Sequence, residues 1–251
     1  MTATQEAEIS SAAPGEASSA GWVGIQQPIG GMTEFTYRCR PDALSPWCRL
    51  FKRSLDIVVA LVTLVATLPV LVLAALALVA ESPGGVFFVQ RRVGLAGRPF
   101  RIVKLRTMRV GNDDREHRVY VAALIRGEGE PQDGIYKIID DDRRTRIGRW
   151  LRSLSIDELP QLWNVLRGDM SVVGPRPPLP EEAALYDQAT WSRMATKPGL
   201  TGLWQVNGRS RLSFEEMIEL DVRYAREWSP LLDLRILLRT PKAVLWNRDT
   251  A

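Results

Sequence analysis

The chain has few of the side chains on which many enzymes and metal sites depend. Its 251 residues include a single histidine, His117, and only two cysteines, Cys39 and Cys48. A histidine-based metal centre or a Ser-His-Asp triad is therefore excluded in practice. Two cysteines are too few for a zinc site or a disulfide framework. Any chemistry must use carboxylates, hydroxyls, lysine or arginine.

Familiar nucleotide-binding motifs are also missing, since the chain has neither a Gly-rich dinucleotide fingerprint nor a Walker-type phosphate loop. Arginine, in contrast, is abundant. The net charge is +4, and only five of the 33 basic residues are lysine. Arginine-rich surfaces suit phosphates, whether in nucleic acid, phospholipid or nucleotide ligands. The composition leaves these three classes of ligand open.

The charged residues leave one long gap, because the 24 residues of Ile57–Ala80 carry no charge. About 20 apolar residues are enough to cross a bilayer. Residues 1–45 begin with a tail rich in Ala, Ser, Glu and Thr and are expected to be disordered or weakly ordered. Residues 46–82 are expected to associate with the membrane, and residues 83–251 to form a cytoplasmic catalytic domain.

Pro69 lies in the middle of this apolar block. Each half then measures about 18 Å as a helix, which is shorter than a hydrocarbon core of about 30 Å. Basic clusters flank the block on both sides, at 49–53 and 91–104. A spanning helix would violate the positive-inside rule at one of them, whereas a re-entrant helix that breaks at Pro69 keeps both in the cytoplasm. A buried core helix is disfavoured, since the block has no polar face.

The remaining sequence predicts an α+β fold that is mostly helical. Two short strands, 86–89 and 100–103, form a β-hairpin whose connection contains Gly94 and Gly97. Helices are predicted at 118–125, 147–154, 155–166, 180–191, 214–228 and 231–245. The amphipathic helix at 214–228 either packs its apolar side chains into the core or lies at the membrane interface.

The segment Ser155-Ile156-Asp157-Glu158 permits two interpretations. Ser155 and Glu158 have the spacing of a capping box, and acidic residues favour a helix N-terminus. Alternatively, Asp157 and Glu158 form a carboxylate pair among arginines. Such a pair supplies a nucleophile together with a metal ligand or base.

The basic residues near this pair favour phosphate binding. Arg149 and Arg152 are one turn apart and share a helix face. Arg176 lies between prolines in Gly174–Pro178, and an arginine on such a stiff turn can grip a phosphate with two hydrogen bonds. Asp169 is either a third carboxylate of the site or a turn residue after Gly168.

From Phe51 to about Leu245, or four-fifths of its length, the chain resembles the bacterial sugar transferases, also called monotopic phosphoglycosyl transferases. Six motifs appear in the family's order: Lys52–Asp56, Val86–Gly94, Lys104–Met108, Leu151–Leu162, Gly168–Pro177 and Lys197–Gln205. One departure is Leu68, where the family often has serine before the proline; Thr67 is the nearest hydroxyl. Another is Asp141-Asp142-Arg143, where the family often has Asp-Pro-Arg.

The resemblance implies that Asp157 attacks the β-phosphate of a UDP-sugar, releases UMP and carries the phosphosugar. Undecaprenyl phosphate then accepts it at the cytoplasmic face of the bacterial inner membrane. Glu158 would bind Mg²⁺, with Asp169 as a further metal-ligand candidate. The remaining candidates, which would bind phosphates or substrate, are Arg152, Arg176, Arg149, Lys104 and Arg106. A homodimer is a further expectation from the family.

The stretch 202–209 resembles members that start exopolysaccharide or O-antigen units, which favours glucose or galactose phosphate as the transferred group. A non-catalytic membrane scaffold would be expected to lose Asp157, Glu158 or an arginine, and all are present. A multi-span transferase would need several apolar blocks, and the chain has one. A nucleic-acid binder leaves the apolar block unexplained, so nucleic acid is not expected as a partner.

Overall fold

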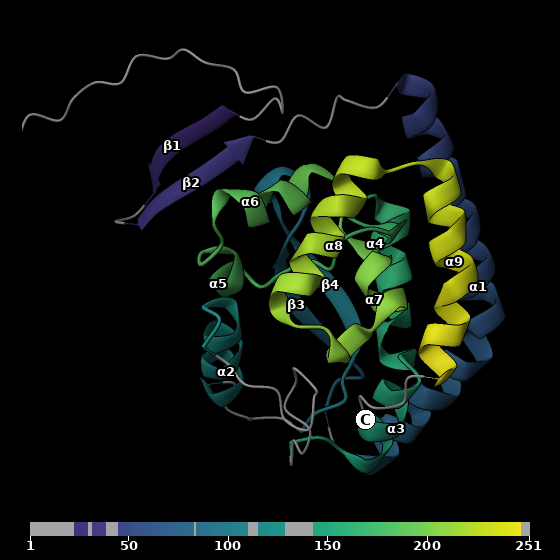
Figure 1. The fold of residues 1–251 in the computed structure, drawn as a ribbon. Coiled ribbons are helices and arrows are strands. Elements are labelled where there is room, and N and C mark those ends of the chain that lie inside the picture. The colour runs from purple at the N-terminus through teal and green to yellow at the C-terminus, as the bar shows by residue number, and fades with distance from the viewer. Residues whose placement is uncertain are drawn as a thin grey trace, which may run out of the picture.

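The computed structural model describes residues 23–29, 32–38, 45–82, 84–109, 115–128 and 143–246. In these ranges a mostly helical domain lies against one long apolar helix (Figure 1). The helices are α1 (Pro46–Glu81), α2 (Arg115–Ile125), α3 (Arg146–Ser153), α4 (Leu162–Arg167), α5 (Pro180–Ala183), α6 (Gln188–Trp191), α7 (Leu203–Asn207), α8 (Phe214–Glu227) and α9 (Pro230–Trp246). The strands are β1 (Val23–Ile29), β2 (Met32–Arg38), β3 (Phe87–Val93), β4 (Pro99–Leu105), β5 (Ser171–Val173) and β6 (Gly199–Thr201).

Helix α1 begins where the Ser45 hydroxyl accepts a hydrogen bond from Cys48 N at 3.2 Å. It continues through Pro69 for 36 residues, so the predicted break into two helices is absent. A proline removes a single backbone donor, and the turns on either side retain theirs. The Thr67 hydroxyl donates to Thr63 O at 2.7 Å, a bond of the kind that bends helices. Within the described residues, α1 is the one helix long and apolar enough to cross a membrane.

Both ends of α1 are attached to the same domain. Near the N-terminal end, Lys52 Nζ lies 2.7 Å from Asp233 Oδ2 and donates to Val173 O at 2.9 Å. At the C-terminal end, the Glu81 carboxylate accepts hydrogen bonds from the first two backbone N–H groups of α3, at 2.7 and 3.0 Å. Between these attachments many of the large apolar side chains are exposed, including Leu61, Val62, Val65, Leu68, Leu73 and Leu76.

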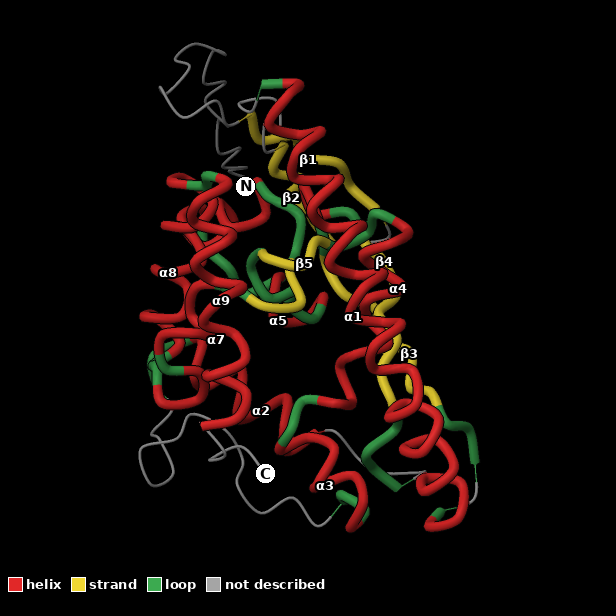
Figure 2. Tube along the Cα trace, turned by 90° about the vertical axis from the view of Figure 1, so that its right-hand side faces the viewer, coloured by secondary structure: helices red, strands yellow, loops and turns green. Residues whose placement is uncertain are grey.

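The main hydrophobic core joins elements that are distant in sequence. Its buried members are Ala60, Ile102, Leu162, Val165, Met170, Val172, Val173, Tyr224 and Ile236. They come from α1, β4, α4, β5, α8 and α9 and, for Met170, from the turn before β5. Strand β5 contacts both α1 and α9 (Figure 2). Burying one such side chain is worth about 1.5–3 kcal/mol, so the core holds β4 and β5 firmly in place.

The predicted β-hairpin is confirmed. Strands β3 and β4 pair antiparallel from Phe87 opposite Leu105 to Val93 opposite Pro99. Their connection uses Gly97 at φ 79° and Ala96 at φ 54°, both left-handed. The parallel pair β5–β6 was not predicted, and neither was the antiparallel hairpin β1–β2 in the segment expected to be weakly ordered. Residues 1–20 and Asp141-Asp142 lie outside the described residues.

The helices predicted at 118–125, 147–154, 214–228 and 231–245 are confirmed as α2, α3, α8 and α9. Two predicted helices are interrupted. The segment 180–191 contains only the short α5 and α6, with Leu185 and Tyr186 between them. The segment 155–166 starts with a 3-10 helix at Ile156–Gln161, followed by α4. Pro160 lies in this 3-10 turn, and without a backbone N–H it cannot complete an α-helical bond there.

Candidate active site

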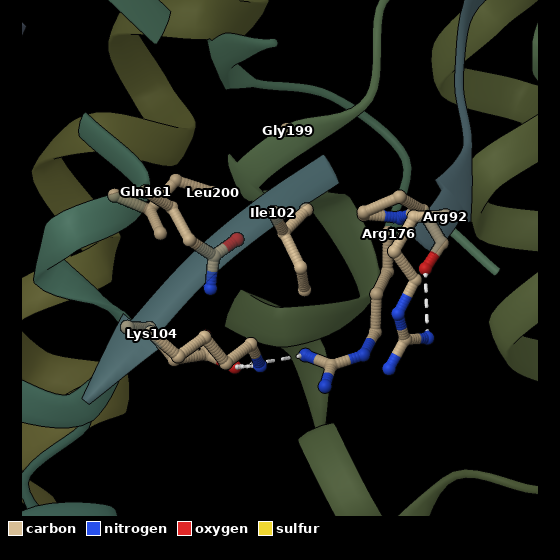
Figure 3. Close-up of a pocket in the computed structure, with 9 residues that line it drawn as sticks. Arg92, Ile102, Lys104, Gln161, Arg176, Gly199 and Leu200 are labelled. Atoms are coloured by element: carbon tan, nitrogen blue, oxygen red, sulfur yellow. Dashed lines mark hydrogen bonds and ion pairs between the residues drawn. The ribbon is translucent and has the colours of Figure 1, made fainter. Parts of the chain in front are cut away.

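A small pocket lies where β3, β4, the 3-10 helix at Ile156–Gln161, the Gly174–Pro178 loop and β6 meet (Figure 3). It is lined by Arg92, Ile102, Lys104, Glu158, Gln161, Arg176, Pro177, Gly199 and Leu200. Its cavity volume of about 10 Å³ leaves room for roughly one water molecule. Charged side chains that pair with one another occupy the rest, so a ligand must exchange partners with them.

The predicted capping box at Ser155 is not formed. Ser155 has a left-handed backbone, with φ 55°, and its side chain caps no backbone N–H group. Its hydroxyl instead accepts a hydrogen bond from Arg209 Nη2 at 2.9 Å. Arg209 is itself left-handed, with φ 54°, and its Nη1 donates to Ala243 O in α9. Backbone strain of this kind concentrates at functional sites, and here it leaves the Glu158 carboxylate available to the pocket.

Glu158 lies between two cations. Its Oε1 is 2.7 Å from Lys104 Nζ and 3.4 Å from Arg176 Nη1. Figure 3 shows the Lys104 and Arg176 side chains reaching into the pocket, with dashed lines for the hydrogen bonds and ion pairs between the residues drawn. Burial opposes ionisation of this carboxyl group, but the charges of Lys104, Arg176 and, more weakly, Arg152 outweigh it. The pKa of Glu158 is therefore held well below its ordinary value. Glu158 is an anion at neutral pH.

The cations of the site are themselves perturbed. Burial lowers the pKa of Lys104, an effect that the attraction of Glu158 partly offsets. Burial, together with the nearby charge of Arg176, lowers the pKa of Arg92 to about 10. Arg92 Nη1 donates to Pro177 O at 3.1 Å. Several positive charges thus gather around one carboxylate, an arrangement that attracts further anions such as phosphates.

Asp157 precedes Glu158 in the same 3-10 helix and is buried, with 7% of its surface exposed. It does not line the pocket. Burial lowers the pKa values of Lys104 and Arg209, and the negative charge of Asp157 acts in the opposite direction on both. Asp157 therefore lies within electrostatic reach of the cations that surround Glu158.

The other predicted site residues lie further out. Arg152 acts on Glu158 through its charge, whereas Arg149 is exposed on α3 and does not line the pocket. Arg106 Nη2 donates to Ser82 O at 2.8 Å, so its guanidinium points to the end of α1. Asp169 lies on the turn after α4 and pairs with Arg167 at 3.5 Å. The structure brings Lys104, Arg176 and Glu158 together, and it does not bring Arg149, Arg106 or Asp169 to the pocket.

Three residues of the site region were not singled out from the sequence. Arg92 and the buried Gln161 line the pocket, and Arg209 supports Ser155 from the 3-10 turn after α7. Each lies inside or at the end of a stretch that carries the family resemblance, at 86–94, 151–162 and 202–209. The family resemblance thus pointed to these stretches, but only the folded structure shows which of their side chains lie at the pocket.

The donor set suits a magnesium ion that is shared with substrate. Within the described residues, no three acidic, histidine or cysteine side chains cluster into a complete metal site. Mg²⁺ usually takes one or two carboxylates and completes its shell with water and substrate phosphates. Both ion pairs of Glu158 use Oε1. Its other oxygen therefore fits such a shared ion, with Asp157 adjacent.

Comparison with known proteins places this site in a family. A family model described as "Bacterial sugar transferase" matches residues 47–247. The chain belongs to the bacterial sugar transferase family. Residues 47–247 include every pocket residue and all of α1 except its first residue. The transferase therefore carries its long apolar helix as part of the family's own sequence.

Several curated relatives are similar over most of this transferase. The exopolysaccharide production protein ExoY of Sinorhizobium fredii is 41% identical over 219 residues, covering 87% of this chain and 96% of the relative. The UDP-glucose:undecaprenyl-phosphate glucose-1-phosphate transferase of Caulobacter vibrioides is 45% identical over 78% of this chain and 70% of its own length. The galactosyl transferase CpsE of Streptococcus agalactiae is 41% identical, but the match spans only 42% of that longer protein.

Proposed function

We propose that this transferase moves a hexose-1-phosphate from a UDP-sugar to undecaprenyl phosphate and releases UMP. The observation that supports this most is the Glu158 carboxylate held between Lys104 and Arg176 beside Asp157. The arrangement offers cations for a diphosphate and a carboxylate next to them. The relative from Caulobacter vibrioides is named for this reaction with glucose.

In the proposed first step, an Asp157 oxygen forms a bond to the β-phosphorus of the donor. The bond from that phosphorus to the bridging oxygen breaks, and UMP leaves with the bridging oxygen and its electron pair. Asp157 then carries the hexose phosphate as an acyl phosphate. An oxygen of undecaprenyl phosphate attacks the same phosphorus, which forms the diphosphate-linked lipid sugar and restores the carboxylate. Splitting the transfer in this way replaces one difficult step by two easier ones.

The cations stabilise the charge that moves during both steps. Lys104 and Arg176 neutralise Glu158 in the free protein, and donor phosphates would compete with Glu158 for them. Once these cations turn to phosphate, the pKa of Glu158 rises toward its ordinary range and its carboxylate is released. It would then hold Mg²⁺, which neutralises negative charge on the diphosphate when bound. Glu158 would also help to take the proton of the acceptor phosphate.

We further infer that α1 does not span the membrane and that the domain lies on the cytoplasmic face of the inner membrane. A straight helix of 36 residues is about 54 Å long, enough to cross a bilayer and project from it. A span would put its two ends on opposite sides, yet Lys52 and Glu81 are both bound by the same domain. The exposed Trp150 of α3 and Leu231, Leu234, Leu238 and Leu245 of α9 extend the apolar surface.

Glucose or galactose is the proposed sugar, and the first membrane step of exopolysaccharide, capsule or O-antigen assembly is the proposed role. Relatives are named for galactose, glucose and exopolysaccharide production. A non-catalytic scaffold of the same fold is the alternative. The buried Asp157 and the partly buried pair of Glu158 and Lys104 disfavour it, because a scaffold has no need to bury charge at such cost.

The deciding experiment follows UMP release by protein in lipid discs, with Mg²⁺, undecaprenyl phosphate and a panel of UDP-sugars. Wild type is expected to release UMP with one or two donors, and Asp157→Asn to release none. Asp169→Asn is the matched control, since this carboxylate pairs with Arg167 away from the pocket. UMP release that persists in Asp157→Asn would exclude the covalent route. If the folded wild type released no UMP with any donor, the scaffold would be favoured.

A further inference from the structure

The Gly174–Pro178 loop is held through its backbone by its surroundings. Four of its groups hydrogen-bond to other segments: Gly174 N to Thr201 O, Gly199 N to Pro175 O, Arg92 Nη1 to Pro177 O and Val93 N to Pro178 O. The three prolines carry no N–H group. Arg176 therefore has the only amide hydrogen between Gly174 and Leu179.

The backbone of Arg176 faces an ion pair that is buried deeper in the domain. Arg193, 5% exposed, donates from Nη2 both to Arg176 O at 2.8 Å and to Asp221 Oδ2. Its Nη1 donates to the Tyr186 hydroxyl at 3.3 Å. Asp221 is fully buried in α8, and the nearby backbone amide of Arg176 lowers the pKa of its carboxyl group. Its Oδ1 has no hydrogen-bond partner among the described residues.

This ion pair is a poor means of stabilising the fold. Burial raises the pKa of Asp221 to about 6, even though Arg193 acts in the opposite direction. Buried pairs often contribute no more than apolar residues of the same size would. The pair instead fixes the relative positions of three segments. The planar guanidinium of Arg193, in the segment before β6, binds both Asp221 of α8 and the carbonyl of Arg176.

We propose that Arg193 and Asp221 are positioning residues for Arg176. They fix its backbone so that its side chain, which is 42% exposed, reaches Glu158 and then the donor phosphate. A long side chain loses less freedom on binding when its base is already fixed. This inference rests on the proposed function, in which Arg176 binds phosphate.

The kinetic test uses Arg193→Lys and Asp221→Asn. A lysine retains the charge opposite Asp221, but its single ammonium lacks the planar fork that serves both Asp221 and the Arg176 carbonyl. Both variants are expected to raise the donor KM at least about tenfold, with a smaller effect on kcat. Glu227→Gln, which breaks an exposed pair on the same helix, should leave both unchanged. An unchanged donor KM in folded Arg193→Lys would overturn the proposal.

A double-mutant cycle separates positioning from general support of the fold. In an Arg176→Lys background the loop no longer presents a guanidinium. Arg193→Lys should therefore raise the donor KM by a much smaller factor in this background than in the wild type. If Arg193→Lys raised the donor KM by the same factor in both backgrounds, Arg193 would act independently of Arg176, and the proposal would fail.

Hydrogen exchange supplies a readout that does not depend on activity. A peptide whose exchangeable amides lie within 175–178 reports Arg176 alone, because its other residues are prolines. Its exchange is expected to accelerate at least about tenfold in both variants, while the buried β5 amides stay protected. If the Arg176 amide exchanged at the wild-type rate in both variants, the positioning role would be wrong. If the wild type releases no UMP but this amide responds as expected, the proposed function fails and the positioning role stands.

Discussion

The Nζ atom of Lys104 lies 2.7 Å from Oε1 of Glu158, although the two residues are 54 positions apart in the chain. Lys104 projects from β4, and Glu158 from the 3-10 helix that precedes α4. Asn164 of α4 fastens these elements together. Its side chain accepts from Val103 N at 3.2 Å and donates to Arg101 O at 2.7 Å. The ion pair is thus built on a rigid junction.

Replacing Lys104 by methionine should abolish most of the transferase activity. The variant keeps the apolar stem but removes a buried cation from the phosphate site. A preorganised charge of this kind is worth about a hundredfold in rate. Arg106→Met is the control, since its guanidinium binds Ser82 O at the end of α1. UMP release by equal amounts of folded protein should fall strongly only in Lys104→Met. Equal losses in both variants would place the two cations in the same role.

Acid should destabilise the wild type through Glu158. The folded state holds the pKa of this group below its ordinary value of 4.5, so it binds fewer protons than the unfolded chain. The resulting stabilisation is present above that value and is lost as the pH falls through the folded pKa. The difference in thermal stability between wild type and Glu158→Gln should therefore be constant above about pH 6 and shrink progressively as the pH falls from about 5 to about 3. A constant difference across this range would show that ionised Glu158 does not stabilise the fold.

Thiol labelling tests whether both ends of α1 lie on the cytoplasmic side of the membrane. Cys48 lies in the first turn of α1, and Ser82→Cys would place a second thiol just past its end. In a Cys39→Ser background, each thiol is examined alone with a membrane-impermeant reagent. Intact cells should leave both unlabelled, and opened cells should label both. Labelling of one thiol, but not the other, in intact cells would establish a spanning helix.

Gly199→Ala should disrupt the junction between β5 and β6. A Cβ atom at Gly199 would overlap the backbone of Gly174 at the start of the Arg176 loop. Neither backbone can move without breaking the bonds of the parallel pair, so the free energy of unfolding should fall by about 1–3 kcal/mol or more. Gly85→Ala is the control, because a Cβ there meets nothing closer than 3.9 Å. Equal melting temperatures for Gly199→Ala and wild type would contradict this packing.

Much of the local structure could be predicted because it depends on neighbours in the chain. The hairpin β3–β4 follows from two apolar runs and the glycines between them. A capping box forms at Ser213, where the serine and Glu216 have the usual spacing: Ser213 Oγ accepts from Glu216 N, and Glu216 accepts from Ser213 N. The similar pattern at Ser155 was misleading, because Arg209 binds that serine and two cations bind Glu158. Long-range charges there override the local preference.

By itself, the sequence determined that the chain has one long apolar helix, few metal or thiol ligands and an acidic pair among arginines. Those properties are set by composition and by spacing along the chain. Only the tertiary structure decided which cations serve the pair. It selected Lys104 and Arg176, added Arg92, and turned Arg106 and Arg149 elsewhere. The physical reason is that charges act over a few ångströms in space, and packing of β4, β5 and α4 into one core decides which of them meet.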